Sequence, residues 1–228
     1  MRVSIESRST KNMSSTRTIP PGWRWVQFRD ICDQDREIIE PGSDLAKTRP
    51  YLSLEHIESN SGRILREPNE ASEDEGQSTT FAFDSRHVLY GKLRPYLNKV
   101  ALPDFEGRCT TELIPLLPKH NISRRFLAWL LRRPATVEAA MREKTGSRMP
   151  RANMDHVLSV KIVIPNSLDL QEQIVNAFEA NIASVLAARK ATQEQIHFLD
   201  LYTRSLLRLF PNKFASATLT EGTTDNDR

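Results

Sequence analysis

Apolar positions in the C-terminal third of the chain recur with the spacing of an α-helix. Residues 169–210 contain neither Gly nor Pro, and the next breaker along the chain is Pro211. A run of this length predicts one helix of roughly 60 Å, at about 1.5 Å of rise per residue. Alternating steps of three and four residues define a seam along it, as in coiled coils. The seam positions are Val175, Phe178, Ile182, Val185, Arg189, Thr192, Ile196, Leu199, Thr203, Leu206 and Phe210.

A helix this long would overhang a domain built from the rest of the chain, so its apolar stripe would be exposed without a covering helix. Eight of the eleven seam positions are apolar, with Arg189, Thr192 and Thr203 as interruptions. We therefore expect a coiled coil with a partner helix. Its predicted dimerisation residues are Val175, Phe178, Ile182, Val185, Ile196, Leu199, Leu206 and Phe210. The alternative is a helix that folds back on its own domain or breaks near Arg189.

Shorter apolar runs precede this helix. Alternating or continuous apolar positions bounded by Gly and Pro predict strands over 88–90, 96–102, 109–117 and 157–164. Residues 123–133 carry apolar positions on one helical face, with Ser123 as the N-cap. Pro134 can open a second helix to about residue 144, and Gly146 is expected to cap that helix.

Aromatic residues mark the start of the folded part. Pro20, Pro21 and Gly22 are followed by Trp23, Trp25 and Phe28, whose spacing predicts an anchor in the core. Together the patterns predict an α+β chain. We expect a mixed α/β domain over 20–168 and a long helix over 169–210. Ser/Thr/Arg-rich residues 1–19 and the polar residues 211–228 are expected to be flexible.

Charge is unevenly distributed although the net charge is only +3 over 228 residues. Segment 55–75 holds seven acidic residues, and segment 119–151 holds nine Lys or Arg against Glu138 and Glu143. A basic face on a nearly neutral protein indicates binding to a polyanion, with a solvated helical surface as the equal alternative. The two cysteines, far apart in sequence, and a polar N-terminus without an apolar stretch favour a reducing cytoplasm.

Enzyme signatures are weak in this sequence. It has eight glycines and five histidines but no glycine-rich phosphate loop and no metal-ligand spacing of His or Cys. Asp104 precedes Phe105, Glu106 and Gly107, and no acid-x-Lys pair follows within thirty residues, so this stretch is interpreted as a turn. We expect no catalytic residue, no metal site and no cofactor.

Two polar clusters are candidates for nucleic-acid binding. The first lies in 90–99, where polar residues alternate with Leu93, Pro95 and Leu97, so an extended chain would place them on one face. Their types suit phosphates and base edges. The first cluster's candidate residues are Lys92, Arg94, Tyr96, Asn98 and Lys99. An exposed strand with ordinary charges explains the same pattern at least as well.

The second cluster, 145–153, joins the predicted basic helices to the last strand. A hydroxyl and two guanidinium groups among small residues are typical of a phosphate clamp, and Ser147, Arg148 and Arg151 are its candidates. A plain connector between helix and strand is the alternative.

Five short motifs, in this order, resemble the specificity (S) subunit of type I restriction-modification systems over residues 20–210. They are P-x-G-W (Pro20, Gly22, Trp23), Y-L-x-x-x-x-I (Tyr51, Leu52, Ile57), G-K-L-R-P-Y-L-N-K (91–99), G-S-x-x-P-x-x-N (Gly146, Ser147, Pro150, Asn153) and I-P-x-S-L-x-x-Q-x-x-I (Ile164, Pro165, Ser167, Leu168, Gln171, Ile174). The sequence departs from the family at Asn166, where a second proline is common, and it contains a single half of the usual tandem arrangement.

The resemblance implies a non-catalytic, prokaryotic cytoplasmic protein whose target recognition domain reads a few base pairs of double-stranded DNA. Long helices of two such halves pack antiparallel in that family and separate the recognition domains. The implied partners are modification subunits, which methylate adenine, and through the complex a restriction subunit. A lone half is expected to form a homodimer or to pair with another S chain, and no membrane is involved.

Two other functions fit parts of the sequence. An assembly adaptor would use the helix to dimerise its partners without reading DNA. A combined nuclease or methyltransferase is the second, and the absent glycine-rich and acid-x-Lys motifs argue against it.

Overall fold

The computed structural model describes residues 19–65, 78–146 and 148–215, with side chains described as far as Arg208. The predicted flexible ends fall almost wholly outside these residues. The chain divides into two compact units, Met1–Val175 and Asn176–Arg228, which are described separately.

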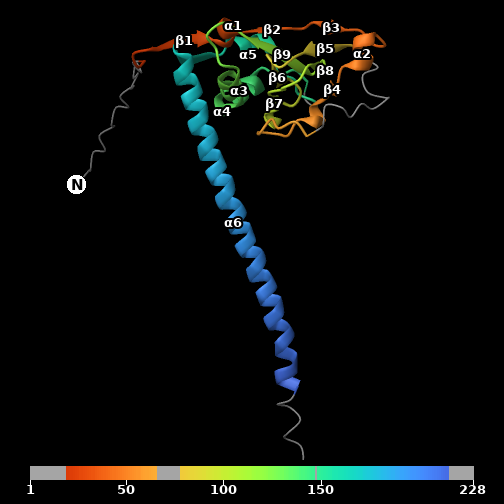
Figure 1. Cartoon of the computed structure of the whole chain (residues 1–228), viewed down its shortest axis with the longest axis vertical. Coiled ribbons are helices and arrows are strands. Elements are labelled where there is room, and N and C mark those ends of the chain that lie inside the picture. Colours follow the sequence, from red (N-terminus) through yellow and green to blue (C-terminus); the bar gives the residue numbers. More distant parts are fainter. Residues whose placement is uncertain (1–18, 66–77, 147, 216–228) are drawn as a thin grey trace, which may run out of the picture. The chain divides into compact units, whose positions relative to one another are not determined.

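The first unit combines short strands with short helices (Figure 1). Its strands are β1 (Trp23–Gln27), β2 (Cys32–Gln34), β3 (Ile38–Ile39), β4 (Tyr51–Leu52), β5 (Thr80–Phe83), β6 (Val88–Gly91), β7 (Val100–Ala101), β8 (Gly107–Thr110), β9 (Leu113–Pro118) and β10 (Lys161–Pro165). Its helices are α1 (Phe28–Ile31), α2 (Asp44–Thr48), α3 (Arg124–Arg132), α4 (Pro134–Arg142), α5 (Met154–Ser159) and the 3₁₀ turns η1 (Leu54–His56) and η2 (Pro95–Leu97). The long helix α6 (Leu168–Ala215) starts in this unit and continues through the second.

The strands form three sheets. One has the order β2-β9-β6-β7 and is antiparallel; another has the order β3-β5-β8-β4, in which β4 and β8 run parallel. The third is a two-stranded antiparallel ribbon of β1 and β10, with Trp25 opposite Val163. A mixed α/β unit followed by a long helix confirms the predicted fold class, whereas the coiled-coil partner stays a prediction.

Strand β6 separates two parts of the core. Val88 and Tyr90 face a cluster with α3 and β10, whose Leu127 and Ile164 are fully buried. Leu89, between them, faces the other cluster, which joins this sheet to β4 and β8. Alternate side chains of a strand point to opposite faces, so the β2-β9-β6-β7 sheet is covered on both. Cys32 and Cys109 are free and buried, and burial raises the pKa of the Cys32 thiol to about 12.

Local capping signals were reliable for α3 and α4. Ser123 Oγ accepts a hydrogen bond from Phe126 N at 3.1 Å, and Pro134 stands at the first turn of α4. The predicted cap at Gly146 is wrong. Helix α4 already ends at Arg142, and Gly146 lies in the following connection with φ of +76°.

Three predicted strands differ from the structure. Residues 96–102 contribute only Val100–Ala101 to a sheet, since a 3₁₀ turn occupies Pro95–Leu97. Residues 109–117 divide into β8 and β9, which belong to different sheets. Residues 157–164 begin as helix, because Asn153 Oδ1 accepts from the backbone N–H groups of residues 155 and 156 and so caps α5.

The aromatic start of the fold is only partly an anchor. Phe28 is fully buried, but Trp25 is 57% exposed, so its predicted place in the core is wrong. Trp25 lies on the outer face of the β1–β10 ribbon, opposite Val163, whereas Ile162 and Ile164 of β10 point inward.

Helix α6 begins at its predicted place and extends past Pro211 to Ala215. From Asn176 to Arg208 every side chain is exposed. Among the described residues, no helix combines the length and apolar character that crossing a membrane requires.

Candidate functional site

The two polar clusters predicted separately from the sequence lie side by side. Leu93 forms an antiparallel bridge with Arg151, which also pairs with Thr145. Arg94 N donates to Pro150 O at 2.7 Å, and the N–H of the residue after Arg151 donates to Lys92 O at 2.8 Å. Residues 92–98, 145–146 and 148–151 therefore form one surface, which we call the paired-loop surface.

A 3₁₀ turn at Pro95–Leu97 projects from this surface. The residues on either side of it, Arg94 and Asn98, both have a left-handed backbone, with φ of 51°. That conformation costs a residue other than glycine roughly 1–3 kcal/mol, so the surrounding contacts must impose it. The turn also closes on itself, because Leu97 N donates to Arg94 O at 2.9 Å.

Asn98 and Lys99, two of the predicted DNA-contact residues, make contacts that hold this turn in place. Asn98 Nδ2 donates to Arg132 O at 3.0 Å, and Lys99 Nζ donates to Leu54 O at 2.6 Å. Partial burial lowers the pKa of Lys99. In this arrangement the Asn98 and Lys99 side chains fix the turn to neighbouring elements, and their contact with DNA stays a prediction.

Other candidates on the paired-loop surface are displayed outward. Arg94 and Arg148 are exposed, and Tyr96 at the turn is 51% exposed. Within the described part of the chain, these three side chains have no hydrogen-bond or ion-pair partner. A guanidinium can bond phosphate or guanine, and a tyrosine offers a hydroxyl or a stacking face. Ser147, the remaining candidate of the second cluster, lies outside the described residues.

Glu112 compensates the other two cations of the surface. Its Oε1 accepts from Arg151 Nε at 2.8 Å, and its Oε2 lies 3.9 Å from Lys92 Nζ. Glu112 thus partly neutralises Lys92 and Arg151 within the unit. Arg94 and Arg148 should therefore attract an anion more strongly than Lys92 and Arg151 do. A depression of about 380 Å³ beside the turn is lined by Ser53, Leu54, Glu55, Leu93, Arg94, Leu97, Lys99, Thr110 and Glu112.

The basic run 119–151 is less available than its charge count suggested. Arg124 Nε donates to His87 O at 2.8 Å, Arg132 Nε donates to Val100 O at 3.2 Å, and Lys119 forms an ion pair with an aspartate of β2. These side chains join elements of the fold. The sequence could not separate them from displayed cations, because both kinds are spaced alike along the chain.

Gln171, at the start of α6, is a structural residue that the sequence motif contained but did not explain. Its side chain is fully buried. The Oε1 atom accepts from Ser123 N at 2.8 Å, and Nε2 donates to Asn121 O at 3.1 Å and Pro165 O at 3.2 Å. One amide therefore ties the first turns of α6 to β10 and to the residue that caps α3.

The predicted seam of α6 separates into two groups. Val175 is fully buried in the chain's own core, so its prediction as a dimerisation contact is wrong. The side chain of Phe210 lies outside the described residues. The other predicted dimerisation residues are exposed by 39–67%: Phe178, Ile182, Val185, Ile196, Leu199 and Leu206.

The described residues contain no cluster of three or more His, Cys, Asp or Glu side chains suited to a metal ion. The described residues do present a cation-bearing surface formed by two loops and a helix whose apolar seam residues from Phe178 to Leu206 are exposed. Both are features of binding.

Comparisons with known proteins give one consistent result. A family model described as the type I restriction modification DNA specificity domain matches residues 22–197. A curated relative, the type I restriction enzyme EcoDI specificity subunit of Escherichia coli, is 27% identical over 191 residues, which cover 83% of this chain and 41% of the relative. The chain therefore spans less than half the length of that relative.

Solved structures share the fold. An HsdS subunit from Thermoanaerobacter tengcongensis matches with a TM-score of 0.65 at 24% identity, over 79% of this chain and 47% of the other. A structure described as the basis of complex assembly and conformational transition of the type I R-M system matches with a TM-score of 0.64 at 22% identity, over 92% and 53% of the two chains.

Proposed function

The chain belongs to the family of type I restriction modification DNA specificity domains, and from that membership we propose that it reads one half of a bipartite DNA target. In this role it binds double-stranded DNA and catalyses nothing. It directs adenine methylation by modification subunits and, through the same complex in a prokaryotic cytoplasm, cleavage by a restriction subunit.

The observation that carries the proposal is the convergence of two distant basic segments on the paired-loop surface. Arg94 and Tyr96 are held out by a turn whose backbone is fixed at both ends. A fixed turn loses little conformational entropy when it binds, which favours recognition of one arrangement of base edges over others. Arg148 and the partly neutralised Arg151 and Lys92 supply phosphate contacts that fix orientation and weaken as salt rises.

The second unit supports pairing with another copy. Its exposed seam from Phe178 to Leu206 is apolar enough to need covering. Two copies related by a two-fold axis present two identical reading surfaces, so the target is an interrupted palindrome. If another specificity chain is the partner, the target is bipartite but asymmetric.

The direct test is co-expression of the chain with a modification subunit of its system, followed by long-read mapping of methylated adenines. Methylation at an interrupted palindrome supports the homodimer. An asymmetric bipartite site supports pairing with a different specificity chain. Absence of site-specific methylation, with both proteins expressed and associated, contradicts the reading role.

A second candidate function rests on the helix alone. The exposed stripe of α6 would suffice for an adaptor that dimerises its partners without reading sequence. DNA binding measured with the modification subunit present separates the two functions. Equal affinity for random duplexes and for any selected sequence favours the adaptor.

A further inference from the structure

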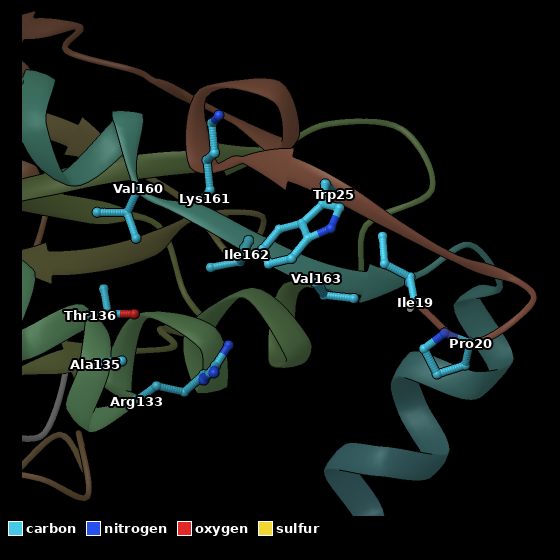
Figure 2. A pocket seen from close by; sticks show the side chains of 10 residues that line it. All are labelled: Ile19, Pro20, Trp25, Arg133, Ala135, Thr136, Val160, Lys161, Ile162 and Val163. Carbon is cyan, nitrogen blue, oxygen red and sulfur yellow. The ribbon is translucent and has the colours of Figure 1, made fainter. Parts of the chain in front are cut away.

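An apolar groove lies between the β1–β10 ribbon and the start of α4. It has a volume of about 420 Å³. Its walls consist of Ile19, Pro20, Trp25, Arg133, Ala135, Thr136, Val160, Lys161, Ile162 and Val163, all within the first unit (Figure 2). The groove is concave, largely aliphatic and large enough for one or two side chains.

Trp25 is the largest apolar group of the groove and is only partly covered by the rest of the unit. Its side chain is 57% exposed, and Figure 2 shows the indole lying along the ribbon beside Ile162 and Val163. The strand fixes this position, because Trp25 pairs with Val163 in the β1–β10 register. Exposed tryptophans in well-formed apolar depressions are frequent anchors of protein interfaces.

Two cations border the groove without carboxylate partners in the described part of the chain. Arg133 stands at the junction of α3 and α4, where its backbone serves as the end of one helix and the cap of the next. Lys161 opens β10 opposite Gln27, and its ammonium projects outward from the rim (Figure 2). The groove therefore matches an occupant that combines an apolar side chain with a nearby carboxylate.

A DNA duplex fits this groove poorly. Its phosphates would meet the two cations, but its stacked bases would leave the aliphatic walls and the indole unfilled. A segment of a partner protein can satisfy both features, since acidic and apolar side chains occur together on amphipathic helices and strands.

We propose that the Trp25 groove is a docking site for an acidic and apolar segment of the modification subunit. This inference rests on the proposed function, which supplies that subunit as the partner. It places the docked segment on the globular unit, with its acidic group near Arg133 and Lys161.

The test uses the full chain with purified modification subunit and measures their dissociation constant. Trp25→Ala and the double substitution Arg133→Glu with Lys161→Glu are each expected to weaken association at least tenfold. The matched control is Leu45→Ala with Lys47→Glu on α2, which removes an exposed apolar group and reverses a charge elsewhere. Each variant's thermal unfolding and DNA affinity are measured in parallel and should stay unchanged.

Zero-length carbodiimide crosslinking tests the chemistry of the occupant. The Lys161 amine should couple to an Asp or Glu of the modification subunit that is adjacent to an apolar residue. Lys161→Arg keeps the charge but lacks a reactive amine, so it should keep the affinity and lose the crosslink.

Two results overturn the docking site while leaving the proposed function intact. One is association within twofold of the unaltered chain for both groove variants. The other is a loss of DNA affinity with undiminished subunit binding, which would assign the groove to the DNA path. If the unaltered chain binds neither DNA nor the modification subunit, the proposed function fails, and the docking site fails with it.

Discussion

The two ends of helix α6 differ in what stabilises them. Its first turns, residues 168–175, are held by the globular unit, where Gln171 and Val175 are fully buried. From Asn176 to Arg208 no side chain is buried, although Ile182, Ile196 and Leu199 repeat the spacing of the buried start. The first segment of the helix is therefore buried by its own chain, whereas the apolar side chains of the second segment can be buried only by a partner.

The same division runs through the paired-loop surface. The side chains of Asn98 and Lys99 donate hydrogen bonds to backbone carbonyls of the unit. Arg94, Tyr96 and Arg148 are exposed and have no such partners among the described residues. Side chains of the first kind set the stability of the fold. Those of the second kind set association, so substitutions should separate the two properties cleanly.

The largest effect is expected on the exposed half of α6. Ile196→Glu with Leu199→Glu should raise the dissociation constant of the dimer at least ~100-fold, because burying unpaired carboxylates opposes association by about 3 kcal/mol or more. Analytical ultracentrifugation at micromolar concentration should then show a monomer.

Ala180→Glu with Ala187→Glu is the matched control, since both positions lie off the seam of the same helix. A dimer that persists in the seam variant, or a monomer in the control, would show that the seam is not the dimer interface.

The next effect is on the buried start of the helix. Gln171→Ala should lower the free energy of unfolding by ~2–4 kcal/mol, because the buried groups Ser123 N and Pro165 O and the carbonyl of Asn121 lose their hydrogen-bond partner. Gln173→Ala, two residues further along and exposed, should change it by less than about 0.5 kcal/mol. Urea unfolding monitored by circular dichroism gives both values, and equal losses would contradict a special role for Gln171.

Arg94→Ala should act on DNA binding and leave stability unchanged. The expected loss is about tenfold in affinity for the methylated site, corresponding to the ~1–3 kcal/mol of a base or phosphate contact. A salt titration decides which contact is lost, since a phosphate contact lowers the salt slope by about one. Arg142→Ala, which removes an exposed arginine paired with Glu138, is the control and should bind normally. Unchanged affinity at every salt concentration would exclude Arg94 from the interface.

The smallest effect concerns the half-exposed ion pair at the start of α6, where Arg125 Nη1 lies 2.6 Å from Glu172 Oε2. Glu172→Gln keeps an oxygen acceptor for the Ser123 hydroxyl and removes only the charge. Exposed pairs contribute little, so a loss of ~0.5 kcal/mol is expected in thermal unfolding at low salt. A loss as large as that of Gln171→Ala would show that this charge stabilises the start of the helix as much as the buried amide does.

The sequence predicted those features whose causes are local. Helix α3 has its cap at Ser123, α4 has Pro134 at its first turn, and α6 has an unbroken periodic pattern, so each could be read from neighbouring residues. The fold class and the family resemblance followed from the same local signals.

Features with distant causes were missed. Alternation over 90–99 would have placed its polar residues on one face of an extended chain, but Arg94 and Asn98 adopt left-handed conformations that contacts with Pro150 and Arg132 stabilise. Those contacts join residues that are tens of positions apart in the sequence, so they produce no periodic pattern in it. For the same reason Val175 was assigned to the seam, since a buried and an exposed valine have the same spacing in a helix.

Hydrogen exchange of the full chain at two concentrations, one above and one below the dimer dissociation constant, tests whether the globular unit is stable alone while residues 176–208 need a partner helix. Amides of 176–208 should exchange slowly at the higher concentration and much faster at the lower one, while amides of β6, α3 and β10 keep their protection at both. Protection of 176–208 that does not depend on concentration, or a globular unit that loses protection together with the helix, would contradict the division of the molecule into a self-sufficient reader and a helix completed by a partner.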